Sequence, residues 1–261
     1  MAKTERQDWA KFKKEFDERG YSILPGVFDA GFVARCRTEL EEAIRKETAY
    51  HKSAEHRDRG MVLMCPLYGD SFLEVFDNDD FSRAFETVMG EGCIIYSYTS
   101  SSMPPKGTNY SHRIHVDCPR LIPDYITNMG AILLLDDFTK ANGATWVLPA
   151  SQWQAEPPSE EAFRAKAVQL EGRAGDVIYL NSRLWHSGGL NTTEHWRHST
   201  TIGVCRPWMK QRLDFPRLLG DLEPILSERA LQKFGFHAQV PASYAEYFAP
   251  PERRKYKQKA E

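Results

Sequence analysis

The chain has no strong charge imbalance and no long apolar run, and each of these absences removes a class of function. Its 261 residues carry 34 Lys and Arg against 36 Asp and Glu, which gives a formal net charge of −2. A nearly neutral chain lacks the field that draws proteins to nucleic acid. No apolar stretch reaches the length needed to cross a bilayer. The sequence therefore predicts neither a nucleic-acid nor a membrane partner, and it favours a small-molecule substrate.

Cysteine is sparse and unpatterned. The five cysteines are odd in number and contain no C-x-x-C pair, which argues against a disulfide scaffold or a structural zinc site. The first residues are charged and have none of the apolar character of a secretion signal. We therefore expect reduced thiols and a cytoplasmic location.

Helical signals dominate the first third of the sequence. A helix is expected from Trp9 to a glycine cap at Gly20, and Asp29 is placed to cap a second helix. A third helix is expected to begin at Asp80 and to end at Gly90. These segments are predicted to support a β-rich core.

The middle of the chain has the texture of short strands separated by Gly, Pro and Asn. Such a pattern is typical of a sandwich or barrel, and the double-stranded β-helix (jelly-roll or cupin-like) core is one such form. The sequence therefore predicts a mainly β protein with supporting α-helices. The expected strands are Cys93–Ser100, Arg113–Asp117, Ile126–Asp136, Ala144–Leu148, Val168–Glu171, Asp176–Asn181 and Ser199–Cys205.

We expect one domain over residues 1–261, because no internal repeat or low-complexity block divides the chain. The C-terminal region returns to helix, roughly from Pro224 to Phe234, and it ends in a basic segment expected to be frayed. Within this domain we expect a helical N-terminal region over residues 1–91 and a β-core over about 92–206. A helical C-terminal region over 207–251 and a tail over 252–261 are expected to follow.

A candidate metal site begins at His115 and Asp117. In an extended strand, residues i and i+2 point to the same face, so one short segment presents an imidazole beside a carboxylate. His186 follows an apolar strand and can supply a third ligand. Together they form a 2-His-1-carboxylate set, which leaves positions open on Fe(II). Taken alone, His-x-Asp is better explained by chance on a half-exposed strand.

Arg197 gives this metal site a specific use. A 2-oxo acid that chelates the iron needs a cation for its far carboxylate, and the planar guanidinium binds carboxylates bidentately without losing its charge. Ser199 has the same strand parity as Arg197 and can add a hydroxyl donor. His112 lies an odd number of residues from His115 and is expected to face away as a non-ligand.

Three further residues are candidates for contact with the substrate. Arg113 shares strand parity with His115, and Arg120 flanks the same loop, so both favour an anionic substrate; solvated rim charges explain them equally well. Tyr98 is expected to line the pocket, although aromatic residues in a β-core more often serve packing. The sequence leaves these alternatives open.

Four blocks in order along the chain carry a family resemblance. The chain resembles the phytanoyl-CoA dioxygenase (PhyH-like) family of Fe(II)/2-oxoglutarate oxygenases over most of its length. The matching segments are Phe16 to Gly26, His115-Val116-Asp117, Leu135 to Gly143 followed by Val147-Leu148-Pro149, and a distal block of Gly175-Asp176-Val177, His186 and Arg197-x-Ser199. Two positions depart from the family pattern: Gln152 replaces a histidine, and Gly188 replaces a frequent serine that contacts the co-substrate.

The resemblance implies iron held by His115, Asp117 and His186, with 2-oxoglutarate and O2 as co-substrates. The reaction it implies is hydroxylation, or another oxidation, of an unactivated C–H bond with release of succinate and CO2. Asp117 is present where related halogenases have a small residue, so oxygenation is expected. We expect a small metabolite or natural-product intermediate as substrate, with an anionic group as one option. The rivals are an acyl-CoA hydroxylase of the same family, a zinc hydrolase or lyase, and a non-catalytic jelly-roll binding module.

Overall fold

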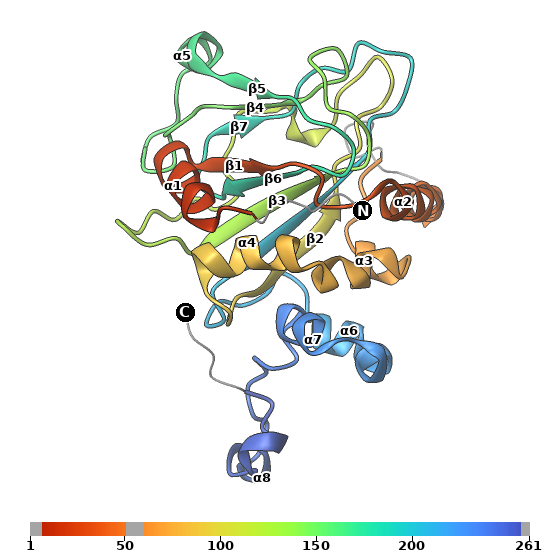
Figure 1. The fold of residues 1–261 in the computed structure, drawn as a ribbon, viewed down its shortest axis with the longest axis vertical. Helices are drawn as coiled ribbons and strands as arrows, with labels where there is room; N and C mark the ends of the chain where they lie inside the picture. Colours follow the sequence, from red (N-terminus) through yellow and green to blue (C-terminus); the bar gives the residue numbers. More distant parts are fainter. Residues whose placement is uncertain (1–6, 51–59, 257–261) are drawn as a thin grey trace.

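Two antiparallel sheets form the centre of the molecule. We describe a computed structural model that covers residues 7–50 and 60–256, with side chains to residue 47 in the first range. The larger sheet has the order β1 (Tyr21–Leu24), β6 (Val177–Asn181), β3 (Asn128–Leu134), β8 (Ser199–Cys205) and β2 (Ile94–Ser100). The smaller sheet has the order β5 (Val168–Leu170), β4 (Thr145–Val147) and β7 (His186–Ser187), and it lies above the larger one in Figure 1.

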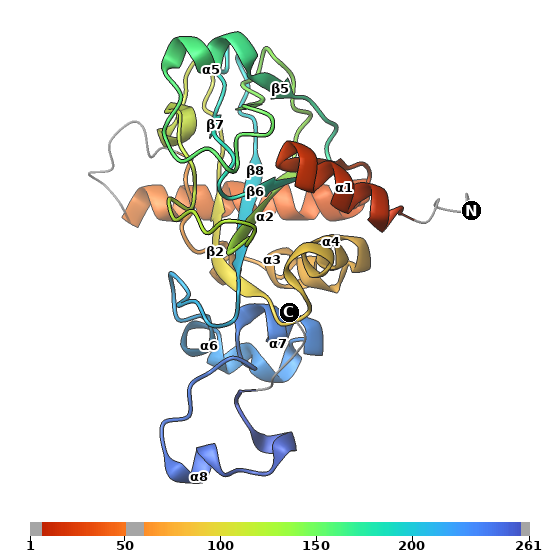
Figure 2. The same ribbon diagram turned by 90° about the vertical axis from the view of Figure 1, so that its left-hand side faces the viewer.

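Helices cover the outer face of the larger sheet. Figure 2 shows α1, α3 and α4 on one side of that sheet, with α6 and α7 below it and α8 projecting away from the body. Within the described residues, no helix is long and apolar enough to cross a membrane. The helices are α1 (Trp9–Arg19), α2 (Ala30–Tyr50), α3 (Ser71–Glu74), α4 (Asp79–Met89), α5 (Glu160–Lys166), α6 (Phe215–Leu218), α7 (Glu228–Phe234) and α8 (Tyr244–Tyr247).

Local signals set the ends of the first helices. Gly20 has a φ of 81°, the left-handed conformation that glycine adopts without strain, and its N–H donates to the Phe16 carbonyl at 2.9 Å. Asp29 accepts from the backbone N–H of Phe32 at 2.8 Å, as a capping residue should. The third predicted helix, α4, begins at Asp79 and not at Asp80, because Asn78 is the residue that caps it.

The central strand β3 is buried along its whole length, because both of its faces are covered. Met129 and Leu133 belong to the larger apolar core, which lies under the helices and is rich in phenylalanine. Ile132 and Leu134 face the space between the two sheets. Burial of an apolar side chain of this size contributes about 1.5–3 kcal/mol. The β-rich fold with supporting helices and a double-stranded β-helix core is therefore as predicted.

Three predicted elements differ from the structure. Arg113–Asp117 is not a strand, because His115 alone makes a strand-like bridge in this segment. The helix expected over Pro224–Phe234 is divided into a 3-10 helix, Gly220–Ile225, and α7, because the extended Ser227 caps α7. The tail expected to be frayed from residue 252 forms a 3-10 turn over Pro251–Arg253 and a bridge between Tyr256 and Ala238. The loop expected from His51 lies outside the described residues as far as residue 59.

The loop before β6 supplies a test of this packing. Gly175 has a φ of 94°, and a Cβ there would meet the carbonyl oxygen of Phe28. We expect Gly175→Ala to lower the free energy of unfolding by about 2–4 kcal/mol. Alanine is strained in the left-handed conformation, and its Cβ would clash with the backbone of Phe28. Urea denaturation measures the change. Gly220→Ala is the matched control, because nothing lies within 4 Å of a Cβ at that position; equal effects of the two substitutions would contradict the explanation.

Candidate metal centre and co-substrate cavity

His115 and His186 face each other as an antiparallel pair. Each backbone N–H donates to the other residue's carbonyl, and both distances are 2.9 Å. His186 lies in β7, so His115 adds one residue to the open edge of the smaller sheet. Residues opposite each other in such a pair project to the same side. The two imidazole rings therefore lie together, with centroids 4.2 Å apart.

The same local geometry fixes the hydrogen positions on both rings. Nδ1 of His115 lies 2.8 Å from the Arg113 carbonyl oxygen, and Nδ1 of His186 lies 2.9 Å from that of Leu184. A carbonyl only accepts hydrogen bonds, so each Nδ1 carries the proton. Each Nε2 then keeps its lone pair for a metal, in the arrangement usual for metal-ligating histidines.

Asp117 completes the cluster. Its Oδ1 lies 3.6 Å from Nε2 of His115 and 3.8 Å from Nε2 of His186. One ligand atom from each of the three residues lies within 4.8 Å of the others. The histidine side chains are largely buried, whereas 45% of the Asp117 side chain is exposed. Two neutral imidazoles and one carboxylate on one side of a site fit Fe(II) and leave its other positions open.

Burial shapes the protonation of this cluster. Desolvation, together with the neighbouring His186, lowers the pKa of His115 to about 4, while Asp117 opposes the shift. His115 is therefore neutral at pH 7 and available as a ligand. Tyr110 lines the same cavity, and burial, with a smaller contribution from Asp117, raises its pKa to about 12. Its phenol therefore keeps its proton near the metal centre.

A small cavity of about 60 Å³ connects the metal cluster with Arg197. Its walls carry hydroxyl groups and small or apolar side chains, and Arg197 is the one cation among the described residues that line it. The lining residues are Ser101, Tyr110, Ser111, His115, Asp117, Gly130, Ala131, Ile132, Thr145, Leu180, His186, Gly188, Arg197 and Thr201.

Arg197 is only 1% exposed, and its charge is not matched by hydrogen bonds. Its Nε and Nη1 have no hydrogen-bond partner among the described residues. Phe138 lies under the guanidinium, with Cζ 4.0 Å from the ring centroid, a stacking that holds the fork in place. Buried donors left without an acceptor are costly. This site therefore fits a ligand that brings a carboxylate into the cavity.

Position 188, where a serine is frequent in the family, has no room for a side chain in this structure. A Cβ at Gly188 would meet Ser111 Oγ and would lie 2.5 Å from Met103 Cε. The Gly188 carbonyl oxygen also lies 3.0 Å from Nδ1 of His112. His112 is not one of the three residues of the cluster, in keeping with the expectation that it is a non-ligand.

Ser199 is not brought to the cavity. Its hydroxyl donates to the Ser101 carbonyl at 2.9 Å, and the residue is absent from the cavity wall. Thr201, two residues further along β8 with the same parity, lines the cavity instead. Strand parity was the right signal here, but it could not tell which of the alternate residues faces open space.

Tyr98 is a core residue, contrary to its expected place in the substrate pocket. It is fully buried, and its ring packs edge-on against Phe72 and Phe76, with centroids 6.0 and 6.4 Å away. Register explains the difference. Tyr98 pairs with Ile202, which also belongs to the core under the helices, so both side chains point away from the space between the sheets.

Arg113 and Arg120 are exposed, and neither lines the cavity. Two other arginines near the same loops are used by the fold. Arg183 donates to the carbonyls of Pro119 and Gln154, and Arg206 donates to those of Ile126 and Met89. The cavity wall therefore gives no support to the anionic-substrate hypothesis.

Sequence reasoning missed Gly130 as a site residue. It lies in the middle of β3, directly opposite Gly203 in β8, and it lines the cavity. A Cβ at Gly130 would meet nothing closer than the Leu180 carbonyl oxygen at 3.9 Å, so packing does not require glycine there. Glycine inside a strand often marks a close approach by a ligand. The signal was present in the sequence as an isolated glycine in a strand pattern.

The fold and this cluster together define a cupin-like protein with a candidate 2-His-1-carboxylate centre. A family model described as phytanoyl-CoA dioxygenase (PhyH) matches residues 16–199. Because this match covers more than half of the sequence, the chain belongs to the phytanoyl-CoA dioxygenase family.

Relatives and solved structures agree with this placement. A protein of Mycobacterium tuberculosis is 27% identical over 247 residues, which cover 91% of this chain and 90% of the relative. Dioxygenase ALT11 of Alternaria alternata is 26% identical over 254 residues, which cover 87% of this chain and 82% of the relative.

The fold is also that of the non-heme alpha-ketoglutarate-dependent carbocyclase SnoK from nogalamycin biosynthesis. The TM-score is 0.63 at 20% identity, with 83% of this chain and 90% of that chain covered. HygX from Streptomyces hygroscopicus, whose structure has nickel and 2-oxoglutarate bound, gives 0.60 at 19% identity, with 79% and 90% covered. The chain is an enzyme of the iron- and 2-oxoglutarate-dependent dioxygenase type.

The lowered pKa of His115 predicts how the metal-free protein responds to acid. Between pH 6.5 and about 4, the unfolded chain binds a proton at this imidazole that the folded protein excludes. The free energy of unfolding should therefore fall as the pH is lowered through this window, by about 2–4 kcal/mol. Urea titrations from pH 7 to pH 4 measure this slope. His115→Gln should flatten it, and parallel curves for the two proteins would contradict the assignment.

Proposed function

We propose that this protein oxidises an unactivated C–H bond of a small metabolite or natural-product intermediate, with 2-oxoglutarate converted to succinate and CO2. Hydroxylation is the default outcome. The observation that carries the proposal is the buried, under-partnered Arg197 in the same cavity as the three candidate metal ligands. A zinc hydrolase does not explain a cation at that depth, and a non-catalytic binding module does not explain three intact metal ligands together with it.

The roles of the residues follow from their positions. His115, Asp117 and His186 would hold Fe(II), and Arg197 would bind the far carboxylate of 2-oxoglutarate. When bound, the iron and the 2-oxo acid supply the oxidising chemistry, while the protein positions the reactants and excludes water. Phe138 keeps the Arg197 fork in a fixed orientation, and burial strengthens its attraction for an anion.

A neutral substrate fits the cavity better than an anionic one. Apart from Arg197, which the co-substrate would occupy, and the three metal ligands, the described lining residues offer hydroxyls, glycines and aliphatic side chains. An acyl-CoA would need cations for its phosphates, yet the nearby Arg183 and Arg206 are already bound to backbone carbonyls. Relatives that are named dioxygenases, and neighbours from nogalamycin biosynthesis, are in keeping with a natural-product substrate.

Gly130 supports this interpretation, since its missing side chain leaves space beside the metal centre. Gly203 opposes it in the register, but a Cβ there would lie 3.0 Å from Ser97 Oγ, and Gly203 does not line the cavity. The bare backbone beside the metal centre is therefore that of Gly130. We propose that Gly130 forms part of the substrate-binding floor.

The proposal predicts a visible charge-transfer band when Fe(II) and 2-oxoglutarate are added without oxygen. Arg197→Met should weaken 2-oxoglutarate binding by about 100-fold, because it removes a buried charge-assisted pair worth about 3 kcal/mol. Titration of the band measures this affinity, and iron binding should persist. His115→Ala and His186→Ala should abolish the band. A wild-type protein without the band, or a band unaffected by the histidine variants, would rule out the site.

Narrowing the substrate floor should separate co-substrate binding from substrate oxidation. We expect Gly130→Ala to keep the charge-transfer band but to lower substrate-stimulated succinate release by about threefold or more, because one methyl group fits without a clash and projects into the cavity. The assay uses whichever compound, in a panel of neutral ring-containing natural products and acyl-CoAs, most stimulates the wild type. Gly130→Leu, whose side chain would fill the cavity, should weaken the band as well. Full activity in Gly130→Ala would remove this residue from the floor.

A further inference from the structure

The cavity between the metal cluster and Arg197 is too small for both 2-oxoglutarate and a whole ring-containing substrate. Its volume is about 60 Å³, whereas pockets that hold molecules of this size usually measure about 300–1,000 Å³. Only the part of the substrate that reacts can therefore reach the metal. The rest has to lie outside the cavity, on the side where 45% of the Asp117 side chain is exposed.

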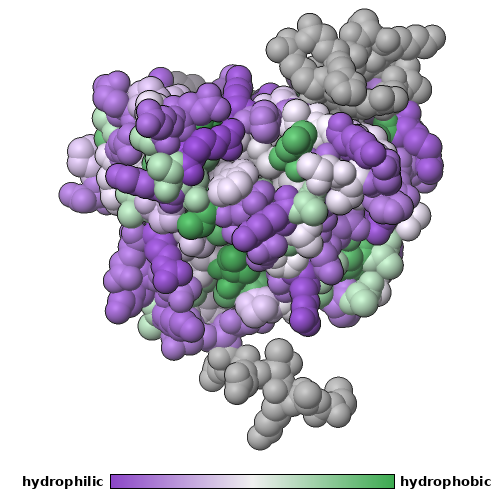
Figure 3. All heavy atoms as spheres, turned by 90° about the horizontal axis from the view of Figure 1, so that it is seen from above, coloured by the Kyte–Doolittle hydropathy of each residue, from purple (hydrophilic) through white to green (hydrophobic). Residues whose placement is uncertain are grey.

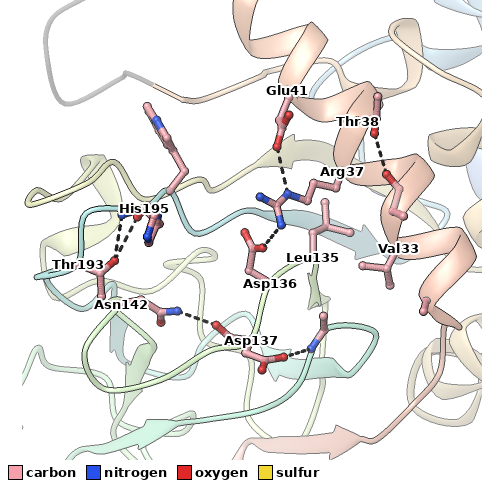
Figure 4. Close-up of a pocket in the computed structure, with 14 residues that line it drawn as sticks. Val33, Arg37, Thr38, Glu41, Leu135, Asp136, Asp137, Asn142, Thr193 and His195 are labelled. Carbon is pink, nitrogen blue, oxygen red and sulfur yellow. Dashed lines mark hydrogen bonds and ion pairs between the residues drawn. The ribbon is translucent and has the colours of Figure 1, made fainter.

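An open groove of about 830 Å³ beside α2 is not a continuation of this cavity. None of the described residues that line the groove also lines the cavity. Figure 4 shows that several polar groups of the groove are bound to one another: Arg37 donates to Asp136 at 2.6 Å and to Glu41 at 3.1 Å, and Asn142 donates to the Asp137 carbonyl at 2.7 Å. The groove therefore lies apart from the path to the metal.

A neutral ring system needs an apolar or aromatic surface to bind in water. Figure 3 shows the upper face of the molecule, where hydrophilic side chains prevail and apolar ones form small, separate patches among the described residues. The loop after β8 differs from that face. It carries Trp208, which is 58% exposed and is the most exposed of the six tryptophans. Its indole therefore offers a large aromatic surface to a ligand.

Trp208 forms an aromatic platform together with Tyr125 and Arg206. Its ring stacks on that of Tyr125, with centroids 6.5 Å apart and an interplanar angle of 19°, and its Nε1 donates to the Tyr125 hydroxyl at 3.3 Å. Arg206 lies against the same Tyr125 ring, with Cζ 4.7 Å from the centroid. The Arg206 guanidinium donates to the carbonyls of Ile126 and Met89 at 3.0 and 2.9 Å. The platform is therefore held in place before any ligand binds.

Two contacts place the aromatic platform next to the open side of the cavity. Directly beyond the ends of β3 and β8, the Arg206 N–H donates to the Thr127 carbonyl at 3.1 Å. Gly130, which lines the cavity, lies three residues further along the chain, and an extended chain covers about 10 Å in three residues. The Thr127 hydroxyl also lies 3.6 Å from Sγ of Cys118, the residue after the candidate metal ligand Asp117. A molecule that reaches the metal from this side can therefore contact the platform.

We propose that Trp208 and Tyr125 bind the ring system of the substrate and thereby determine which substrates are oxidised. This inference rests on the proposed function. The substrate class it names is a neutral molecule with a flat, unsaturated ring system, which stacks on the exposed indole while the carbon to be oxidised extends past Asp117 to the metal. A flat ring keeps its whole face in contact with the indole, so the platform selects such rings over saturated or open-chain molecules.

The plain alternative is that Trp208 only shields Tyr125 and Arg206 from water. In that case its removal would loosen the loop after β8 and would weaken the binding of flat and saturated molecules alike. The stacking role predicts a loss that is larger for flat rings and that Trp208→Phe largely restores, because phenylalanine keeps an aromatic face. The pattern across ligands and variants therefore distinguishes the two roles.

The first measurement needs neither iron nor 2-oxoglutarate. Ligand-observed NMR on the full chain gives the dissociation constant of 2-naphthylmethanol, a neutral flat probe, and of its fully saturated analogue. We expect Trp208→Ala to weaken binding of the flat probe about fivefold or more and binding of the saturated analogue clearly less. Trp153→Ala is the matched control, because Trp153 is 41% exposed and lines neither the cavity nor the groove. A wild type that does not bind the flat probe, or equal losses for the two probes, would overturn the proposal.

The second measurement is substrate-stimulated succinate release by the Fe(II)-loaded enzyme, with the ring-containing compound that most stimulates the wild type. We expect Trp208→Ala to raise the KM for that compound about fivefold or more, with little change in kcat and none in the affinity for 2-oxoglutarate. An unchanged KM would overturn the platform's role in substrate selection. A wild type without the charge-transfer band would instead refute the proposed function, while the probe titrations would still decide whether the platform binds flat rings.

Discussion

The two main-chain hydrogen bonds between His115 and His186 are the constraint on which the site depends. They fasten a loop that has no strand structure of its own to the free edge of β7. Side-chain direction in such a pair follows from the backbone, so the rings meet without any contribution from the metal. The carbonyls of Arg113 and Leu184 then orient both rings. Metal binding therefore meets ligands whose positions and tautomers are already set.

A second constraint is the burial of Arg197. Two nitrogens of this guanidinium have no hydrogen-bond partner among the described residues, and Phe138 stacks on its face. The stacking does not satisfy the Nε and Nη1 donors. Without co-substrate, these buried donors therefore lack an acceptor. A carboxylate of a dianionic ligand can accept from them, which favours binding.

Patterns that depend on one strand were predictable, whereas those that depend on the pairing of distant segments were not. Parity along β8 correctly relates Arg197 to Thr201, but the place of Ser199 depends on which neighbours fill the space. The proximity of His115 and Asp117 is predicted from a strand that the structure does not contain; the segment is a loop held at His115 by its bridge to His186.

The misplaced residues fail for similar physical reasons. Tyr98 lies on the opposite side of the sheet from the one predicted, and a bulge between Ile95 and Ser97 shifts the register of β2 against β8 just before it. Sequence alone does not reveal such a shift. Arg113 and Arg120 were predicted to contact the substrate because of their charge. Long charged side chains near a cavity mouth, however, reach water at little cost.

One end of the cavity is buried and the other is open to solvent, so ligands can enter from one side only. Arg197 and Phe138 lie at one end and are each 1% exposed, whereas the Asp117 side chain is 45% exposed at the other. A ligand that must reach Arg197 has to pass the metal cluster first. The co-substrate would therefore enter before the substrate, and the substrate would close the open side near Asp117 and Tyr110. The burial of Arg197 is the reason to expect this order, because a substrate already bound at the exposed end would block the path to the buried cation.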